Sequence, residues 1–392
     1  MRIGIGRLAG FIACALSLCG TWAATAWAQD KYPSRPVRVI VPFSQRGRTG
    51  SRRGGWWWGG DGALPPSLWH IALQKFAIAL VAGASLIATT SFAQSYPSKP
   101  VRVIVPFSPG GGSDVLARYL GPRLAERLGQ PVVVDNRPAA SGVVGADLVA
   151  KATPDGYTLL LVFSTHAQSA QLFAKLPFDP IKDFAPITLV ITTPLGMMLS
   201  PAVPAKSVKE FIAHAKANPG KLNYGSSGPG SSPHLAAELF MSMAGVQMTH
   251  IPYKGVAPII AAQLGNEVQF SFANMFSTEG HWRAGRLRLV AHAGAKRLDS
   301  MPELPTISES GVPGYEAIIW YGYMTAAKTP RPIVDRLNQE IRAVANLPDV
   351  RKTLTSQGNE VIAGTPQDFA KLIVTDADKW GAIGRKLGVK LD

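Results

Sequence analysis

From residue 96 onward, short apolar runs alternate with stretches in which apolar residues recur at every fourth position. The run 101–105 is rich in β-branched residues, which is typical of a buried strand. Ser113 or Asp114 is expected to cap the helix that follows, and Gly129 to end it. On one face of that helix, leucines recur at every fourth position: Leu116, Leu120, Leu124 and Leu128. The pattern predicts a strand, a glycine-rich turn and an amphipathic helix.

The alternation of strands and helices continues toward the C-terminus. Further strands are predicted at 132–134, 157–163, 221–224, 268–272 and 288–293. Further helices are predicted at 143–152, 207–217, 233–244, 331–345 and 366–387. Such alternation indicates the α/β class, with a parallel sheet between two layers of helices. Because 392 residues exceed one ordinary hydrophobic core, we expect two domains.

Residues 1–93 contain two segments that resemble export signals. The first, 1–28, has the charged, apolar and small-residue order of a secretory signal peptide and ends in Ala26-Trp27-Ala28. The second signal-like segment, 68–93, ends in Ser91-Phe92-Ala93. Either segment predicts export by a signal peptide, and the periplasm is the expected location.

The stretch 29–67 is a partial duplicate of the mature N-terminus followed by a junction. Residues 32–44 match residues 96–108 at twelve of thirteen positions, and at the thirteenth Arg35 corresponds to Lys99. The duplicate then stops in a stretch rich in Arg, Gly and Trp that has neither a helical nor a strand period. We expect residues 1–93 to contribute little to function; the alternative is an aromatic and basic patch for a membrane or nucleic acid.

The formal net charge of +15 is unevenly placed. Residues 1–94 hold ten of the 40 Lys and Arg and two of the 25 Asp and Glu, so they carry +8 and the remainder only +7. A modest excess without a basic run favours small anionic ligands, and no nucleic acid is expected as a partner. Both cysteines, Cys14 and Cys19, lie in the first signal-like segment, so no disulfide is expected in the body.

Three predicted strand ends, at 107–114, 164–166 and 225–234, carry the candidate chemistry. Ligands of open α/β sheets bind beyond the carboxyl ends of strands, where glycines allow close backbone approach and helix starts offer free N–H groups to an anion. These segments contain no Arg or Lys, so an anion must be held by N–H and hydroxyl groups. The candidate ligand-binding residues are Phe107, Ser108, Pro109, Gly110, Gly111, Asp114, Ser164, Thr165, His166, Ser226, Ser227, Gly228, Ser231, His234 and Asn274.

Several candidates have a structural alternative. Asp114 could accept an amine of the ligand or cap a helix, and His234 could contact the ligand or make a local structural bond while neutral. Lys254 could pair with a second carboxylate or stay solvated near the lobe boundary. The helix after Ser232 is expected to take that serine as its cap, with Pro233 in the first turn.

Enzyme classes lack their motifs in this sequence. The loop 110–115 has no third glycine of a dinucleotide loop, and a serine stands where a phosphate loop needs its lysine. No G-x-S-x-G nucleophile elbow is present, and the seven histidines show no metal-ligand spacing. We expect no catalytic residue, no metal and no cofactor.

The chain from Tyr96 to Asp392 resembles the Bug family, the solute receptors of tripartite tricarboxylate transporters. The phrases that carry the resemblance occur in order: Tyr96-Pro97, Val101–Phe107, Pro109-Gly110-Gly111, Asp135-Asn136-Arg137-Pro138, Leu176–Pro180, Asp183–Pro186, Gly228…Leu235, Pro252–Gly255 and Gly311–Gly314. One departure is Ala273, which stands where the family often has Asp or Asn, although Asn274 is adjacent.

The resemblance implies a two-lobe periplasmic binding protein, type II-like, with the ligand cleft between lobes. The expected limits are 94–198 for lobe 1, 199–321 for lobe 2 and 322–392 for the return to lobe 1. It also implies a ligand carboxylate held by the first-lobe glycine loop, by Ser164-Thr165 and by the second-lobe loop Ser226–Ser231. The implied function is a monomeric extracytoplasmic receptor that delivers a small carboxylate to membrane transporter subunits. Presentation of the ligand to a sensor kinase and an enzyme on the same fold are the alternatives.

Overall fold

The computed structural model describes residues 96–389. The two signal-like segments and the partial duplicate, predicted at 1–28, 29–67 and 68–93, lie outside these residues. Among the helices of the described part, none is both long enough and apolar enough to cross a membrane.

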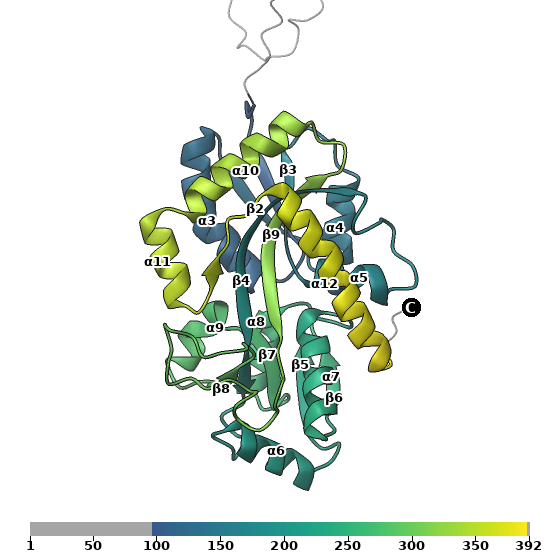
Figure 1. Cartoon of the computed structure of the whole chain (residues 1–392), viewed down its shortest axis with the longest axis vertical. Helices are drawn as coiled ribbons and strands as arrows, with labels where there is room; N and C mark the ends of the chain where they lie inside the picture. The colour runs from purple at the N-terminus through teal and green to yellow at the C-terminus, as the bar shows by residue number, and fades with distance from the viewer. Residues whose placement is uncertain (1–95, 390–392) are drawn as a thin grey trace, which may run out of the picture. The chain divides into compact units, whose positions relative to one another are not determined.

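Lobe 1 is built on a mixed sheet whose strand order is β2-β1-β3-β9-β4, with β10 beside β4 (Figure 1). Its strands are β1 (Val101–Val105), β2 (Val132–Asn136), β3 (Thr158–Phe163), β9 (Ile318–Ala326), β10 (Glu360–Val361) and the first part of β4 (Phe184–Leu199). Its helices are α3 (Gly112–Leu128), α4 (Val143–Ala150), α5 (Thr165–Leu172), α10 (Arg331–Ala345), α11 (Pro348–Ser356) and α12 (Pro366–Lys386), with a 3-10 turn at Ala140–Gly142.

Strand β1 and helix α3 follow directly from the apolar pattern. Val103 of β1 packs in one core cluster and Ile104 in another, so the strand is buried on both faces and is apolar except at Arg102, which pairs with Asp135. The four leucines of α3 join the first cluster, and Gly129 ends the helix with φ at 67°. The predicted strand, amphipathic helix and glycine stop are confirmed.

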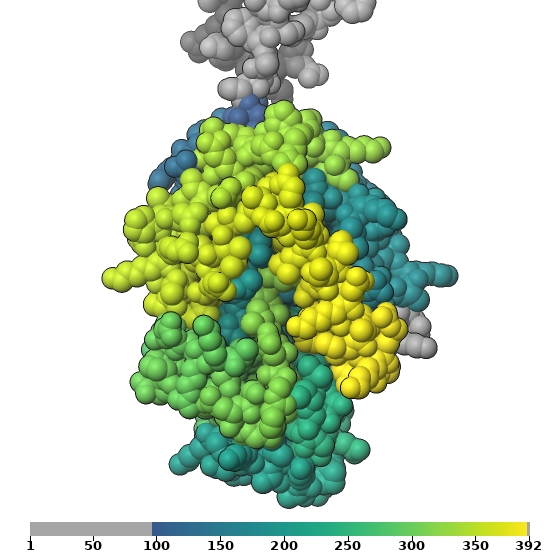
Figure 2. All heavy atoms as spheres, viewed as in Figure 1, coloured from purple at the N-terminus to yellow at the C-terminus, as the bar shows by residue number. Residues whose placement is uncertain are grey.

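Lobe 2 continues from the second part of β4, in the order β4-β7-β5-β6, with β8 also paired to β4. Its strands are β5 (Asn223–Ser226), β6 (Thr249–Pro252), β7 (Phe270–Asn274) and β8 (Arg288–His292). Its helices are α6 (Val208–Ala217), α7 (Ser232–Ala244), α8 (Val256–Leu264) and α9 (Met275–Trp282). Figure 2 shows the C-terminal helix α12 (yellow) lying against the teal surface of α7, so a lobe 1 helix also contacts lobe 2.

The long strand β4 joins the two lobes. Its pairing changes from β9 to β7 between Pro194 and Leu195, and the chain returns where the Leu195 amide donates to the Ala317 carbonyl oxygen at 3.1 Å, just before β9. The expected lobe limits at 198 and 321 fall a few residues beyond these crossings, and they remain predictions. Figure 1 shows β4 and β9 side by side between the upper and lower groups of helices.

The prediction of a parallel sheet is correct for only part of each lobe, because the sheet is mixed. β1 is parallel to β2 and β3, and β5 is parallel to β6 and β7, but β9 is antiparallel to β3 and β4, and β4 is antiparallel to β7 and β8. The chain reaches β9 from lobe 2 through an irregular segment without a crossover helix, so the parallel rule does not apply there.

Candidate functional site

The loop between β1 and α3 turns at Gly110, whose φ of 80° is a conformation that favours glycine. Asp114 braces this turn: its Oδ2 accepts from the Gly110 amide at 2.9 Å and its Oδ1 accepts from Arg118 Nε at 2.9 Å. Burial alone would raise the pKa of Asp114, but the bonds from Arg118, Gly110 and Asn136 hold it below its ordinary value. Its carboxylate is therefore engaged by the protein itself.

The start of α3 differs from the prediction. The N-cap is Gly111 and makes no side-chain bond, so neither Ser113 nor Asp114 is the cap. Gly112 lies so close to the neighbouring strands that an added Cβ would be 2.2 Å from the Tyr321 hydroxyl oxygen and 2.5 Å from Asn274 Nδ2. The Ser113 hydroxyl is buried without a hydrogen-bond partner. The first N–H groups of a helix also have no intrahelical partner, so α3 presents free donors here.

The segment after β3 is committed to structural contacts. Ser164 Oγ accepts from the Trp320 amide at 3.0 Å, and Thr165 Oγ1 accepts from the Ser232 amide at 2.9 Å. His166 Nε2 contacts the Pro180 carbonyl oxygen at 2.8 Å, and burial lowers the pKa of this histidine to about 4. Thr165 thus connects the two lobes, while Ser164 and His166 brace lobe 1.

In lobe 2, the loop from Ser226 to Ser231 precedes α7. Ser226 Oγ lies 2.6 Å from His250 Nε2 and accepts from the Gly228 amide at 3.1 Å. His234 Nδ1 accepts from the Gly230 amide at 3.0 Å. The N-cap of α7 is Ser231, not the predicted Ser232.

Two hydroxyl groups of this loop remain available. The Ser231 hydroxyl is buried without a partner. Ser227 is also buried, and among the described residues its hydroxyl makes no hydrogen bond. Ser227 lines two cavities that lie at the junction of the lobes. The loop therefore carries two free hydroxyl groups at the start of a second helix.

The two lobes touch directly around these loops. The Ser108 amide and hydroxyl donate to the Lys254 carbonyl oxygen at 3.1 Å and 2.9 Å. Ser141 Oγ donates to the Pro229 carbonyl oxygen at 2.9 Å. Because both contacts join a lobe 1 loop to a lobe 2 loop, the structure is a closed form of the two lobes.

Two cavities lie within this closed junction. A small one of about 20 Å³ is lined by Gly111, Gly112 and Ser113 of the α3 start and by Ser227 and Pro233 at the α7 start. A larger one of about 190 Å³ is lined by residues from both lobes: Pro106, Phe107, Ala139, Ala140, Ser141, Gly142, Ser227, Gly228, Pro229, Pro252, Tyr253 and Lys254. Phe107 and Ser227 line both, so the two cavities are adjacent.

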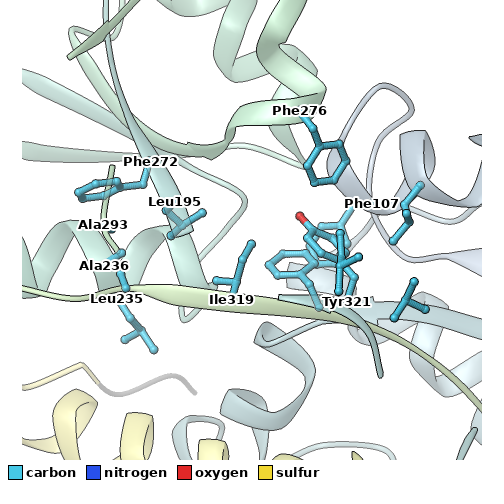
Figure 3. Packing of buried hydrophobic residues seen from close by; sticks show 14 of the residues in the cluster. Phe107, Leu195, Leu235, Ala236, Phe272, Phe276, Ala293, Ile319 and Tyr321 are labelled. Atoms are coloured by element: carbon cyan, nitrogen blue, oxygen red, sulfur yellow. The ribbon is translucent and has the colours of Figure 1, made fainter. Parts of the chain in front are cut away.

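The cavity walls combine apolar surface with neutral donors. Phe107 packs on Phe163 at a ring distance of 4.7 Å, and Tyr321 packs on Phe163 and on Phe276 at 5.7 Å each. Figure 3 shows Phe107, Phe276 and Tyr321 grouped together near β9. None of the described residues that line the two cavities carries a carboxylate, and one of them, Lys254, carries a positive charge. An anion with an apolar body suits such a site.

The structure separates the predicted site residues into two groups. Five candidates line the two cavities: Phe107, Gly111, Ser227, Gly228 and Asn274. The unpartnered Ser231 lies beside them as the cap of α7. The others form the frame: Ser108 and Thr165 join the lobes, Gly110, Asp114, Ser164, His166, Ser226 and His234 brace loops, and Pro109 is exposed.

The cavity residues that sequence reasoning did not select include Gly112, Ser113, Ser141 and Tyr321. Gly112 and Ser113 stood inside the glycine loop but were not selected, because the pattern does not show which glycine is crowded or which hydroxyl is unpaired. Ser141 and Tyr321 lie outside the three segments. Tyr321 belongs to β9, whose apolar run 318–326 was the available signal.

Two lobes joined by long strands, with helix N-termini and free hydroxyl groups at their junction, define a two-lobe solute-binding protein. A family model described as "Tripartite tricarboxylate transporter family receptor" matches residues 116–389. The chain therefore belongs to the receptor family of tripartite tricarboxylate transporters, a family of periplasmic solute-binding proteins. The resemblance to the Bug receptors is confirmed.

Solved structures of periplasmic binding proteins resemble this chain. The periplasmic binding protein BugD is 31% identical, with a TM-score of 0.73 over 76% of this chain and 100% of that one. Rpa4515 of R. palustris, solved with adipate, is 34% identical, with a TM-score of 0.74 over 76% and 100% of the two chains. MatC (Rpa3494) of Rhodopseudomonas palustris, solved with bound malate, is 30% identical, with a TM-score of 0.70 over 74% and 99%. These likenesses support the two-lobe binding-protein fold.

Proposed function

We propose that this protein is an extracytoplasmic receptor that closes its two lobes on a small carboxylate and delivers it to the membrane subunits of a tripartite tricarboxylate transporter. The observation that carries the proposal is the meeting of two helix starts, α3 and α7, with three unpartnered hydroxyl groups: Ser113 and Ser227 line the small cavity, and Ser231 is the N-cap of α7. Helix N-termini and free donors stabilise an anion without a buried counter-charge.

The proposed pose follows from the two cavities. One carboxylate oxygen pair lies at the starts of α3 and α7, and the ligand body extends past Phe107 into the larger cavity toward Lys254. The engaged Asp114 leaves no partner for a ligand ammonium group, which favours acids without an amine. The adipate and malate named for the two relatives are acids of this kind and support the proposal.

The partner and location of the receptor are part of the same proposal. The family membership supports delivery to a transporter and export to the periplasm, by one of the two signal-like segments. We propose that the protein acts as a monomer and binds without chemical conversion of its ligand. Co-purification with the transporter membrane subunits in the presence, but not the absence, of ligand is the expected result for the delivery step.

A thermal-shift and calorimetric screen tests the ligand class. Adipate, malate, aromatic acids, tricarboxylates and amino acids are compared with their neutral amides or esters on the full-length protein. A ligand of the folded state raises the melting temperature by mass action, so acids without an amine should shift it and the esters should not. Equal binding of an acid and its ester would place the site elsewhere.

A further inference from the structure

A pair of stacked histidines supports the second-lobe loop without lining either cavity. His234 of α7 and His250 of β6 stack with ring centroids 4.1 Å apart and planes 17° apart. The ring of Tyr224 in β5 lies 4.9 Å from that of His250, nearly parallel to it. Neither histidine is among the residues that line the two cavities, so a direct contact with the ligand does not explain them.

Each imidazole holds a different point of the loop between β5 and α7. His234 Nδ1 accepts from the Gly230 amide at 3.0 Å, so this nitrogen carries no proton. His250 Nε2 lies 2.6 Å from Ser226 Oγ, which in turn accepts from the Gly228 amide and donates to the Gly228 carbonyl oxygen, each at 3.1 Å. Gly228 and Gly230 both have positive φ, at 117° and 69°, so these bonds hold turns next to Ser227 and Ser231.

We propose that His234 and His250 are positioning residues of the carboxylate site: as neutral imidazoles they hold the loop so that Ser227 and Ser231 face the ligand, and proton uptake releases it. The inference rests on the proposed function, because it names how the site of that function is supported and regulated.

The surroundings favour the neutral form of both rings. A positive charge on His234 would lie in the first turn of α7, where the helix dipole opposes it, and would face His250 at stacking distance. Burial lowers the pKa of His234 to about 3, with a further contribution from His250, and burial lowers the pKa of His250 to about 4.

Two other titratable groups face the pair. Glu238 Oε1 lies 3.7 Å from His234 Nε2 and favours a proton there, but it also accepts a hydrogen bond from the Tyr224 hydroxyl. Because protonation of His234 Nδ1 would remove the acceptor of the Gly230 amide, the loop would lose this bond in acid.

Matched variants test the two positions in the full-length protein. H234N places an amide oxygen near the position of Nδ1 and does not titrate, whereas H234L fills similar space without an acceptor. H250Q and H250L form the equivalent pair for Nε2. Adipate affinity is measured by calorimetry at neutral pH, amide exchange at Gly228 and Gly230 by nuclear magnetic resonance, and unfolding by urea.

We expect H234L to bind adipate about tenfold or more weakly, with faster exchange at Gly230, because one buried amide loses its acceptor. H234N should bind within about threefold of the natural protein. H250L should likewise bind adipate more weakly than H250Q, with faster amide exchange at Gly228. When the pH is lowered to about 4 and below, toward the pKa values of the two histidines, the natural protein should lose more affinity than the H234N/H250Q double variant, in which neither position titrates.

Normal adipate binding and unchanged exchange in both leucine variants would overturn the inference, as would failure of both amide variants to restore the loop. If the natural protein binds no carboxylate, the proposed function fails, yet the exchange at Gly228 and Gly230 still decides whether the histidines hold the loop. If a leucine variant does not fold, a pH titration of these two amides in the natural protein replaces it: unchanged amides down to about pH 3, near the lower of the two pKa values, would overturn the inference.

Discussion

The two loops that meet at the cleft have the same form but different supports. Each follows a parallel strand, turns at glycines with positive φ and opens a helix: Gly110 leads to α3, and Gly228 and Gly230 lead to α7. In lobe 1 the support is the ionised carboxylate of Asp114 with Arg118. In lobe 2 it is a pair of neutral imidazoles, His234 and His250.

This difference in support predicts which loop responds to acid. The pKa of Asp114 lies below its ordinary value, so its bonds persist when the solution becomes mildly acidic. His234 accepts from the Gly230 amide only while its Nδ1 carries no proton. Of the buried histidines, His234 and His292 belong to lobe 2 and His166 belongs to lobe 1. Acid should therefore weaken lobe 2 before lobe 1.

The largest expected effect is a loss of stability in acid. Burial lowers the pKa of His166 and of His292 to about 4, below the value near 6.5 of the unfolded chain, so the unfolded chain takes up protons first. Their contribution to stability is complete above about pH 6.5, is lost as the pH falls and levels off near pH 4, at roughly 3 kcal/mol for each histidine. Urea unfolding at a series of pH values measures it.

Asp376 acts in the opposite direction. Burial raises the pKa of its carboxyl group to about 6, so the folded protein favours the protonated form and gains some stability as the pH falls through that value.

Hydrogen exchange resolved by residue distinguishes the two lobes: as the pH falls, protection should decrease first in β5–β7 of lobe 2. A flat stability curve, or earlier loss in lobe 1, would contradict the comparison.

Gly112→Val should have the next largest effect, because the added Cβ would overlap the Tyr321 hydroxyl group. Overpacking of this kind costs about 1–3 kcal/mol of unfolding free energy, and carboxylate binding should weaken by about tenfold or more. Gly111→Ala is the control: its Cβ would lie 3.5 Å from the nearest atom, the Ser108 carbonyl oxygen, in ordinary contact. Equal losses in the two variants would show that the crowding is not at Gly112.

Asp114→Ala tests the lobe 1 support alone. It removes two hydrogen bonds of a charged acceptor and should weaken carboxylate binding by about tenfold, by a factor that changes little between neutral pH and about pH 5. Calorimetry at the two pH values measures it, and Asp114→Asn, which keeps one acceptor oxygen, is the matched control. A strong pH dependence of the loss would remove the contrast between the loops.

Ser227→Ala tests the contact surface shared by the lobes. Loss of one hydroxyl donor to a charged acceptor should weaken binding by about 3- to 100-fold with little change in stability. Ser164→Ala provides the comparison, because Ser164 Oγ accepts from the Trp320 amide away from the cavities and should affect unfolding more than affinity. If Ser227→Ala binds normally, the ligand does not reach the start of α7.

The smallest effect is expected from removal of residues 1–93. The described sheet begins with β1 at Val101 and uses the second copy of the repeated segment, so a chain that starts at Gln94 should unfold cooperatively and bind as tightly as the full-length protein. Urea unfolding and calorimetry compare the two proteins. Loss of cooperative unfolding would assign a structural role to the first copy.

The apolar pattern alone determined the local elements of this protein. The run 101–105 and the leucines of α3 predicted a buried strand and an amphipathic helix, because a period in sequence becomes a face in space. Glycine, serine and threonine at strand ends also indicated the cleft loops. Local sequence carries this information because it concerns backbone freedom and the burial of neighbouring side chains.

Tertiary structure decided which of these residues are free to bind a ligand. Ser164, Ser226 and Ser227 are alike in sequence, yet the Trp320 amide and His250 engage the first two and leave the third at the cavities. The antiparallel strands β4 and β9 were missed for the same reason. Strand direction and hydrogen-bond partners are set by residues far apart in the chain, and a local pattern contains no information about them.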